Sequence, residues 1–442
     1  MLIKGGTVVT GDGSTSMAEG EVLIRDGRIA AVGRNLGAQE NDVIDASGRI
    51  VLPGAVNTHA HGCVQGPFVP VASPAFSAEE VERELDRHLL GGETTVLCVC
   101  GFCLPREITG KHPVRVRLAT SHTPSNFAAA DIVDGQGLTP EHRATTVERA
   151  LADGAVALGE FGAGHSLGGG GQDYLYIPQV IERATGVRLR PDQARELKWA
   201  VLGRRLSPDA FDPAATDRCL RRFGLDTKLG VDEARELIGR SVLPSIKITL
   251  QGFEEAAALS EKTGARAVFH NSPVSVGTIA ELALKYPKAK LVAGHSNQGD
   301  FEPEEAAAWA RTLRERGVTV DISTWDIPGK AIQAKPDNFL HLLAEKLVDT
   351  VSTDYAGGDW EPILKGLDIA VKRGAVGLAQ AIALATANPA RLFPELAGER
   401  GLLAPGKIAD VVLVDADNIG AVRTVLVGGT IVANDGKRQS SP

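Results

Sequence analysis

The amino-acid sequence predicts an α/β protein, a (β/α)₈ TIM barrel that carries a small β-sandwich domain formed from both chain ends. The central part of the chain supports the barrel, because short apolar or β-branched runs alternate there with helical stretches that have polar faces. The number of such runs matches the number of strands that closes this barrel. The eight runs are 54–61, 94–101, 114–122, 155–162, 265–272, 289–296, 317–324 and 347–355.

The two ends of the chain support the second domain. Residues 1–53 contain short β-rich runs separated by glycine, such as "GEVLIRDGRIAAVG". Residues 401–442 resume the same pattern in "GLLAPGKIADVVLVD" and "VRTVLVGGTIVANDG". Strands and turn residues at such close spacing are typical of a small β-domain. We therefore expect a composite β-sandwich from 1–53 and 401–442, and a barrel from 54–400.

One segment of the barrel region is too long for an ordinary loop. Roughly eighty residues separate "GEFGAG" from "PSIKIT", whereas a barrel loop usually has about two to six. The segment begins with "LGGGGQ" and includes helical stretches at 190–208 and 230–244, so we expect a helical insertion at about 163–243 on the rim of the barrel. Residues 183–222 hold ten Lys/Arg against five Asp/Glu. Solvated helix faces are the favoured interpretation, and a patch that faces the mouth would favour an anionic ligand.

Composition and charge exclude several classes of protein. The chain has 442 residues, of which 43% are hydrophobic and 23% charged, and no apolar run is long enough to cross a bilayer. A net charge of −8 without a basic tail argues against nucleic acid or an anionic membrane as the main partner. The N-terminal "MLIKGGTVVTGDG" lacks the apolar core of a signal peptide. We expect a cytoplasmic protein that acts on a small molecule and forms a homo-oligomer.

The five cysteines are too few for a disulfide framework in so long a chain. Three of them, Cys98, Cys100 and Cys103 in "LCVCGFC", could form a thiolate metal site. The favoured interpretation is packing. Cys98 and Cys100 alternate on one face of a buried strand, and a free cysteine packs as a small hydrophobic residue.

Residue types that bind metals recur where the predicted strands end. The stretch "GAVNTHAHGC" places His59 and His61 two apart at the end of the first strand, and therefore on one strand face. His270 ends the fifth strand, His295 the sixth and Asp354 the eighth. The carboxyl ends of barrel strands meet at one mouth. Because imidazole and carboxylate groups readily share a divalent cation, these residues predict a metal site.

These motifs resemble the metal-dependent amidohydrolase superfamily. The resemblance rests on "HAH" at strand one, single histidines on strands five and six and "STD" on strand eight, and it covers almost the whole chain. In detail, "GGTVVTGDG", "PGAVNTHAH" and "GLTPEHRATTVERALADGAVALGEFGAG" look most like enamidase, which opens a cyclic amide. The resemblance implies a metal-dependent hydrolase that acts on a carbon–nitrogen bond other than a peptide bond.

The resemblance also implies a bridging ligand at the end of the fourth strand, where many relatives carry a carboxylated lysine. This chain offers Glu160 in "ALGEFGAG" and Lys247 in "PSIKIT", the latter followed by one helix and the strand that ends at His270. A strand at 245–249 would give nine candidates, and enamidase-like proteins show a glutamate, so Glu160 is preferred. Lys247 is then expected in the loop after strand four, either near the substrate or simply solvated.

The expected centre binds two divalent metal ions, Zn²⁺ in preference to Fe²⁺ or Mn²⁺. Two cations that share a hydroxide lower the pKa of the bound water from about 16 to about 7. Asp354 is expected to move the proton to the leaving nitrogen, and His295 to help polarise the carbonyl. His122 and His165 follow strands three and four and are candidates, with Lys247, for substrate binding. The remaining histidines, His88, His112, His142 and His341, are expected on helix or loop surfaces. The expected metal ligands are His59, His61, Glu160, His270, His295 and Asp354.

The expected substrate is a small cyclic amide such as a lactam or imide, with a carboxylate as an optional substituent held by basic residues of the insertion. The main alternative is a deaminase of a heterocyclic amine. Such relatives commonly carry a glutamate three residues after the strand-five histidine, where this chain has Pro273. An N-acyl amino acid hydrolase is a further alternative. A non-catalytic scaffold is less favoured, because every ligand position is retained.

Overall fold

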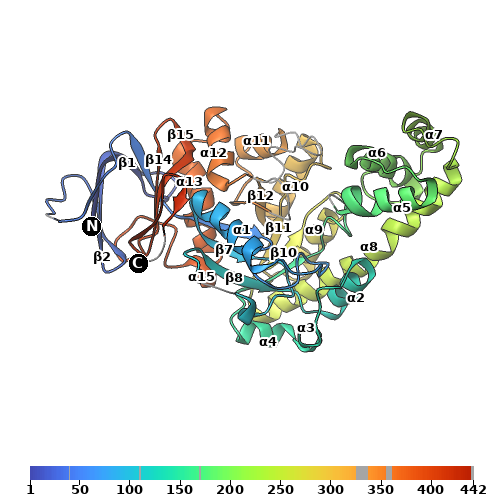
Figure 1. Cartoon of the computed structure of the whole chain (residues 1–442), viewed down its shortest axis with the longest axis horizontal. Coiled ribbons are helices and arrows are strands. Elements are labelled where there is room, and N and C mark those ends of the chain that lie inside the picture. Colours follow the sequence, from blue (N-terminus) through green and yellow to red (C-terminus); the bar gives the residue numbers. More distant parts are fainter. Residues whose placement is uncertain (39, 109–110, 169–170, 325–336, 355–360, 440–442) are drawn as a thin grey trace.

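The computed structural model describes residues 1–442 except 39, 109–110, 169–170, 325–336, 355–360 and 440–442. Three parts follow one another along the long axis of the molecule (Figure 1). A β-sheet that contains both chain ends lies at one end, the barrel lies in the middle, and a group of helices lies at the other end. The predicted fold class is confirmed: a parallel eight-stranded barrel stands beside a separate sheet.

Each predicted run contains one barrel strand. In chain order these are β6 (Ala55–Ala60), β7 (Glu93–Cys98), β8 (Arg115–Thr120), β9 (Ala157–Phe161), β10 (Ala267–His270), β11 (Leu291–Gly294), β12 (Thr319–Ser323) and β13 (Thr350–Ser352). Each strand pairs in parallel with the next. Where the last strand meets the first, the amide of Asp354 donates to the carbonyl of His59 at 2.9 Å. The carboxyl ends of the strands therefore converge on one mouth.

Helices cover the outside of the barrel. In α1 (Ala78–Leu90), the Ser77 hydroxyl accepts from the amide of Glu80, whose carboxylate accepts from the amide of Ser77, so the helix begins at a capping box. Val81, Leu85 and Leu89 recur every four residues and pack into the main core. The other helices of this layer are α2 (Pro124–Val133), α3 (Pro140–Ala144), α4 (Val147–Ala152), α9 (Val276–Lys285), α10 (Pro303–Glu315), α11 (Asp337–Ala344), α12 (Ile363–Lys372), α13 (Leu378–Ala385), α14 (Ala387–Leu392) and α15 (Pro394–Ala397).

The two chain ends build one continuous sheet. Its strands are β1 (Leu2–Val9), β2 (Ser16–Arg25), β3 (Arg28–Gly33), β4 (Val43–Asp45), β5 (Arg49–Pro53), β14 (Val411–Asp415), β15 (Asn418–Val427), β16 (Thr430–Asn434) and β17 (Lys437–Arg438). The ends join where β14 runs antiparallel to β5 and Leu413 pairs with Val51. Ile3, Val22 and Leu426 share the same core. The alternating apolar side chains of both ends bury one face together, as expected for a half-buried sheet.

The insertion between β9 and β10 is helical. It contains α5 (Ile177–Thr185), α6 (Pro191–Leu202), α7 (Pro213–Arg222) and the first half of α8 (Val231–Thr263), with a π-helical turn at Gln172–Tyr176 and a 3₁₀ turn at Pro208–Ala210. These helices form a core of their own that includes Ile181, Leu197 and Ile238. The 33 residues of α8 extend over about 50 Å, at 1.5 Å per residue. The later part of α8 packs on the barrel through Phe253 and Ala257, so one helix joins the insertion to the barrel.

The structure corrects the prediction for Lys247. Residues 245–249 lie inside α8, so they form neither a ninth barrel strand nor the loop after strand four. The buried positions Ser245, Thr249 and Phe253 recur every four residues, which is the period of a helix and not of a strand. The side chain of Lys247 is exposed on the opposite face of α8.

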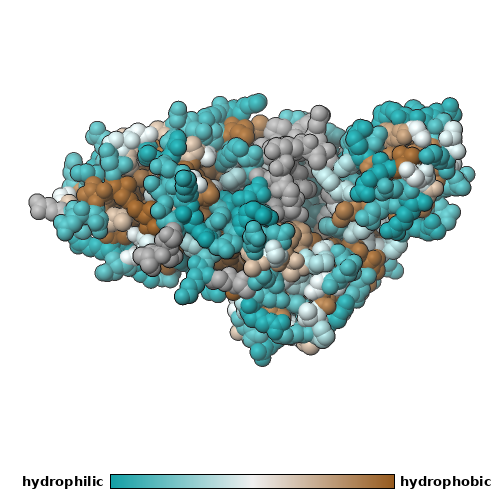
Figure 2. Space-filling model, viewed as in Figure 1, coloured by the Kyte–Doolittle hydropathy of each residue, from teal (hydrophilic) through white to brown (hydrophobic). Residues whose placement is uncertain are grey.

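Charge pairs occupy most of the basic side chains of the insertion. The described cations with a carboxylate partner within 4.0 Å include Arg188, Arg190, Arg195, Lys198, Arg204, Arg205, Arg221, Arg222 and Arg240. The visible face of the insertion is largely hydrophilic (Figure 2). Nearby carboxylates therefore neutralise most of the excess positive charge in 183–222. This supports the interpretation as solvated helix faces over that of a basic patch that binds an anion. In the described part of the chain, no helix combines the length and apolar character needed to cross a membrane.

Candidate metal centre

The six predicted ligands come together at the mouth of the barrel. His59 lies in β6 and His61 just after it, while Glu160 lies in β9. His270 is the last residue of β10, His295 directly follows β11, and Asp354 follows β13 by two residues. All six side chains are buried, and the most accessible is that of Asp354, which is 12% exposed. The barrel thus concentrates two carboxylates and four imidazoles in one water-poor space.

Glu160 lies at the centre of this group. Its Oε1 atom is 3.1 Å from His295 Nε2, 3.3 Å from His270 Nδ1 and 3.6 Å from His59 Nε2. Its Oε2 atom is 3.5 Å from His61 Nε2. A carboxylate with one oxygen near three imidazoles and the other near the fourth can bridge two cations. Glu160 thereby occupies the position that the alternative assigned to a lysine.

Asp354 completes the centre on the side of β6. Its Oδ1 atom is 3.3 Å from His59 Nε2 and 3.6 Å from His61 Nε2, and Oδ2 is 4.0 Å from His295 Nε2. Two overlapping triads result, His59 with Glu160 and His295, and His59 with His61 and Asp354. In each triad the ligand atoms lie within 4.8 Å of one another, a spacing that a single cation can span.

The backbone at two of these residues is unusual. His295 and Asp354 have φ angles of +36° and +46°, a left-handed conformation that residues other than glycine rarely adopt. Such strain costs about 1–3 kcal/mol and persists where the surrounding structure fixes it, commonly at functional sites. Here it turns both side chains from strand ends toward the centre of the mouth.

Hydrogen bonds on the far side of the rings orient the imidazoles. His270 Nε2 lies 3.3 Å from the carbonyl of Gly168. At His59 it is the backbone amide, and not the ring, that donates to Asn57 Oδ1, at 3.1 Å. His61 Nδ1 lies 3.7 Å from the sulfur of Cys100. Partners of this kind fix the tautomer of a metal-binding histidine. The sequence reasoning missed all three: Asn57 and Cys100 stand close to the ligands in the chain, whereas Gly168 gives no signal before the loop is folded.

The charges of the centre shift the pKa values of its members. Burial by itself would lower the pKa of His59, but Glu160 and Asp354 raise it to about 10. Burial would raise the pKa of Glu160, but His59 and the other imidazoles hold it well below its usual value. Burial and the neighbouring His295 lower the pKa of His270. The carboxylates therefore stay ionised, and a cation that enters must displace protons from imidazoles.

The residues fit a cation in a further respect. The Nδ1 atom of His59, which is 1% exposed, has no hydrogen-bond partner in the described part of the chain, and Nε2 makes no well-aligned hydrogen bond although Asp354 Oδ1 lies 3.3 Å away. A buried polar nitrogen left unpaired is costly, and buried groups of this kind are usually satisfied by an ordered water or an ion. His59 Nε2 faces both carboxylates, so a divalent cation between them would satisfy it.

Of the two other histidines near the mouth, His122 is buried and His165 half-buried, and low pKa values leave both uncharged at neutral pH. His122 follows β8, its Nδ1 lies 2.8 Å from Thr120 Oγ1, and burial lowers its pKa to about 4. Burial and the positive charge of His270 lower the pKa of His165 to about 4 as well. Neither is a ligand of the six-residue centre. The substrate-binding role expected for both is not tested by these contacts.

The prediction of a surface position is wrong for two histidines, His88 and His142. His88 is fully buried on α1, with Nδ1 2.5 Å from Glu93 Oε2. His142 is also buried, with Nε2 2.9 Å from Glu107 Oε1. Each sits in a polar stretch of sequence, but a carboxylate from another element makes its burial possible, and that partner is visible only in three dimensions.

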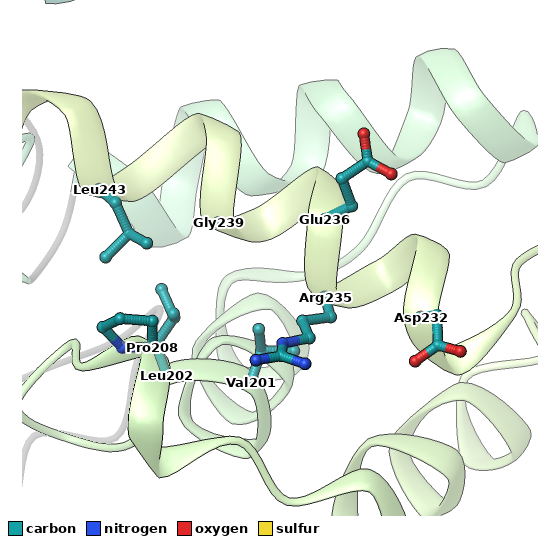
Figure 3. A pocket seen from close by; sticks show the side chains of 8 residues that line it. All are labelled: Val201, Leu202, Pro208, Asp232, Arg235, Glu236, Gly239 and Leu243. Carbon is teal, nitrogen blue, oxygen red and sulfur yellow. The ribbon is translucent and has the colours of Figure 1, made fainter.

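A pocket of the insertion lies apart from this centre (Figure 3). It is bordered by the start of α8, with Asp232, Arg235 and Glu236, and by Val201 and Leu202 at the end of α6. None of the six predicted ligands lines it. Because its lining mixes apolar and oppositely charged side chains, it has no convergent set of catalytic groups.

The fold and the site define a metal-binding TIM-barrel protein whose candidate ligands come from the ends of five different strands. Comparison with known proteins identifies the family. The model of the Amidohydrolase family matches residues 183–432, more than half of the chain. The chain belongs to this family, and the predicted superfamily is confirmed. The finer resemblance to enamidase stays a prediction.

Several relatives are similar over part of the chain. D-hydantoinase of Geobacillus stearothermophilus is 35% identical over 121 residues, 27% of this chain and 22% of that protein. Dihydroorotase of a Thermoanaerobacter species is 37% identical over 100 residues, 22% of this chain and 21% of that protein. The chain thus matches about a fifth of the length of these curated relatives. A D-aminoacylase structure that concerns a binuclear metal centre has a TM-score of 0.59 at 15% identity and covers 100% of this chain and 98% of its own. That likeness shows the fold.

Proposed function

We propose that the protein is a metal-dependent hydrolase that opens a small cyclic amide, a lactam or an imide, at its carbon–nitrogen bond. The observation that carries this proposal is the convergence of Glu160 and Asp354 with four imidazoles at one barrel mouth. The relatives support the substrate class, because a hydantoinase by its name acts on a hydantoin, a cyclic imide. The enamidase-like motifs point to the same chemistry.

The proposed cofactor is a pair of divalent cations. His59, His61 and Asp354 would hold one, His270 and His295 the other, and Glu160 would bridge them. A set of nitrogen and carboxylate ligands without thiolate suits Zn²⁺, and Fe²⁺ or Mn²⁺ are the alternatives. When bound, such a pair lowers the pKa of water from about 16 to about 7 and polarises a carbonyl.

Asp354 is the proposed acid–base group. It is the most accessible of the six side chains and its carboxylate faces the open mouth between His59 and His295. It accepts a proton from the attacking water as the new carbon–oxygen bond forms. It then donates this proton to the ring nitrogen as the carbon–nitrogen bond breaks, so the leaving group departs as a neutral amine or amide. His295 stabilises negative charge that develops on the carbonyl oxygen.

His122 and His165 are proposed as neutral groups that contact the substrate. With pKa values of about 4, they can exchange hydrogen bonds with an amide at neutral pH but cannot supply a positive charge. The Nε2 atom of His122 is buried and has no partner in the described part of the chain. Two neutral imidazoles therefore suit an uncharged ring amide better than a carboxylate. Lys247 has no part in the proposal, because it lies on an exposed face of α8.

Location and assembly are further proposals. All five cysteines are unpaired and buried, as is usual where thiols stay reduced, and this supports a cytoplasmic location. A homo-oligomer is the expected state. Sedimentation at two protein concentrations would test it, and a mass of one chain at both would contradict it.

The test of function is a substrate panel with the metal-loaded enzyme. Lactams, imides and hydantoins form one group, linear N-acyl amino acids the second, and aminated purines, pyrimidines and triazines the third. Ring opening and ammonia release are measured in parallel, with Asp354→Asn as the control. We expect turnover in the first group only. Ammonia released from the third group alone would replace the proposal by a deaminase, and turnover of the second group alone by an N-acyl amino acid hydrolase.

A further inference from the structure

Four of the five cysteines gather beside the metal centre. Cys63 follows β6, Cys98 ends β7, and Cys100 and Cys103 lie in the loop that follows β7. All four are at most 3% exposed and belong to the apolar layer between the barrel strands and the helices. The fifth, Cys219, lies in α7 of the insertion. Two separate chain segments thus bring thiols to one buried point.

The sulfur atoms are close enough to share one cation. Those of Cys98, Cys100 and Cys103 all lie within 4.8 Å of one another. Cys63 is not part of this three-residue group: its thiol donates to the carbonyl of His61 at 3.4 Å, and its sulfur lies 3.7 Å from His88 Nε2. Four thiolates about 2.3 Å from a tetrahedral zinc ion are about 3.8 Å apart. The sulfur atoms of Cys98, Cys100 and Cys103 therefore need only small side-chain shifts to reach that geometry.

A backbone hydrogen-bond donor and a histidine that is hydrogen-bonded to a carboxylate lie next to the thiols. The amide of Gly62 donates to Cys100 Sγ at 3.4 Å, a contact that stabilises negative charge on sulfur. His88 Nε2 lies 3.7 Å from Cys63 Sγ, and Glu93 orients that ring through Nδ1 at 2.5 Å. A carboxylate that holds a histidine in this way is the usual support of a metal-binding ring. Nothing in the proposed hydrolysis uses these groups.

We propose that Cys98, Cys100 and Cys103 form a second metal site, which binds a thiophilic d¹⁰ cation such as Zn²⁺, and that Cys63 turns toward this cation as the fourth ligand. Without the cation, the thiols of Cys63 and Cys103 donate to the carbonyls of His61 and Pro67, each at 3.4 Å. Binding replaces these thiol protons, which are released to solvent. Packing alone explains burial of single cysteines, but it does not require four polarisable sulfur atoms from two segments to meet.

The two sites are in contact. Cys100 Sγ lies 3.7 Å from His61 Nδ1, and His61 turns its Nε2 to Glu160 and Asp354. A cation on the sulfur atoms would fix Cys100 and thereby the orientation of His61. Loss of such an outer partner typically costs about 10- to 100-fold in metal affinity or activity. The thiolate site would therefore act as a structural support for the centre at the mouth.

The experiment uses the full-length protein, stripped of metal and reloaded with Zn²⁺ or Co²⁺. The variants are Cys98→Ser and Cys103→Ser, with Cys219→Ser as the matched control outside the cluster. We expect the cobalt protein to show a near-ultraviolet charge-transfer band from sulfur to metal. Both cluster variants lose this band and bind one Zn²⁺ fewer per chain, while Cys219→Ser keeps both. The histidine and carboxylate centre has no sulfur ligand, so it cannot produce the band.

Two results would overturn the proposal. One is a cobalt-loaded wild-type protein without the sulfur band. The other is equal zinc content in wild type, Cys98→Ser and Cys103→Ser, provided that circular dichroism shows all three folded. The readout is independent of the proposed hydrolysis, because a failed substrate panel changes neither the band nor the difference in zinc content.

Discussion

Replacing Glu160 by glutamine tests the centre directly. The change keeps the shape of the side chain and removes its charge. In the native protein the two carboxylate oxygens lie 3.1–3.6 Å from ring nitrogens of all four histidines. No other side chain in the described part of the chain contacts all four histidines within 4.0 Å. Removing the charge of Glu160 should therefore weaken metal binding at both proposed positions.

The size of the effect follows from the burial of this charge. Glu160 is 2% exposed, so solvent screens its interactions little. Removing one partner from a buried charge pair costs about 3–5 kcal/mol. If the same loss applies to a bound cation, metal affinity falls roughly 10²- to 10⁴-fold, at about 1.4 kcal/mol per tenfold change. We expect less than the full complement of two metal ions after dialysis, and turnover reduced at least in proportion.

The assay measures metal per chain and turnover of the best substrate after equilibrium dialysis at several metal concentrations. Asp173→Asn is the matched control, because it removes a fully buried carboxylate that pairs with Lys198 in the insertion. That control is expected to destabilise the insertion and keep its metal. Full metal content and activity in Glu160→Gln would refute the bridging role, and equal metal loss in both variants would show that the effect is general unfolding.

Three further changes test other parts of the reasoning. Asp354→Asn should lower kcat by about 10²- to 10⁴-fold, the usual range for general acid–base catalysis, and steady-state kinetics that leave kcat within tenfold would contradict this role. Since burial lowers the pKa of His122 from 6.5 to about 4, the unfolded chain takes up this proton first as the pH falls. The stability that neutral His122 gives above pH 6.5 is therefore lost toward pH 4, by about 2 kcal/mol between pH 7 and 5. In urea unfolding His122→Asn should lose less over this interval, and an equal loss would count against a buried neutral ring. Lys198→Met removes one of the two cationic partners of Asp173, and Arg195 stays at 2.9 Å, so the insertion should lose less than the roughly 3–5 kcal/mol of a fully unpaired buried charge; an unchanged rate of proteolysis between α6 and α7 would show that the Lys198 pair contributes little.

The sequence determined the barrel and the position of each strand. Eight apolar runs became eight strands, because a parallel strand buried on both faces must be apolar along its whole length and its helical neighbours must be amphipathic. The ligands followed from this register. The carboxyl ends of all barrel strands lie at the same mouth. Once the barrel closes, side chains at these ends therefore meet there, including "HAH", the histidines of β10 and β11 and the aspartate after β13.

Sequence was less informative where partners come from distant segments. The segment around Lys247 has an apolar alternation that is compatible with a strand. In the structure it is part of a helix of 33 residues, because its apolar side chains pack against the insertion on one part and against the barrel on the other. His88 and His142 lie in polar stretches, and their burial depends on Glu93 and Glu107. The local sequence pattern shows which residues are apolar, but it does not show which charged side chains will lie next to each other in the folded protein.

The tertiary structure also decided the choice at the fourth strand and the meeting of the thiols. Glu160 and Lys247 were both compatible with the sequence, and the distances from Glu160 to four rings selected the glutamate. Gly62 stands 38 positions before Cys100 in the chain, yet its amide donates to the Cys100 sulfur at 3.4 Å because β6 and β7 are neighbours in the barrel. Contacts between side chains on adjacent strands depend on strand pairing and register, and these are fixed only when the whole sheet closes.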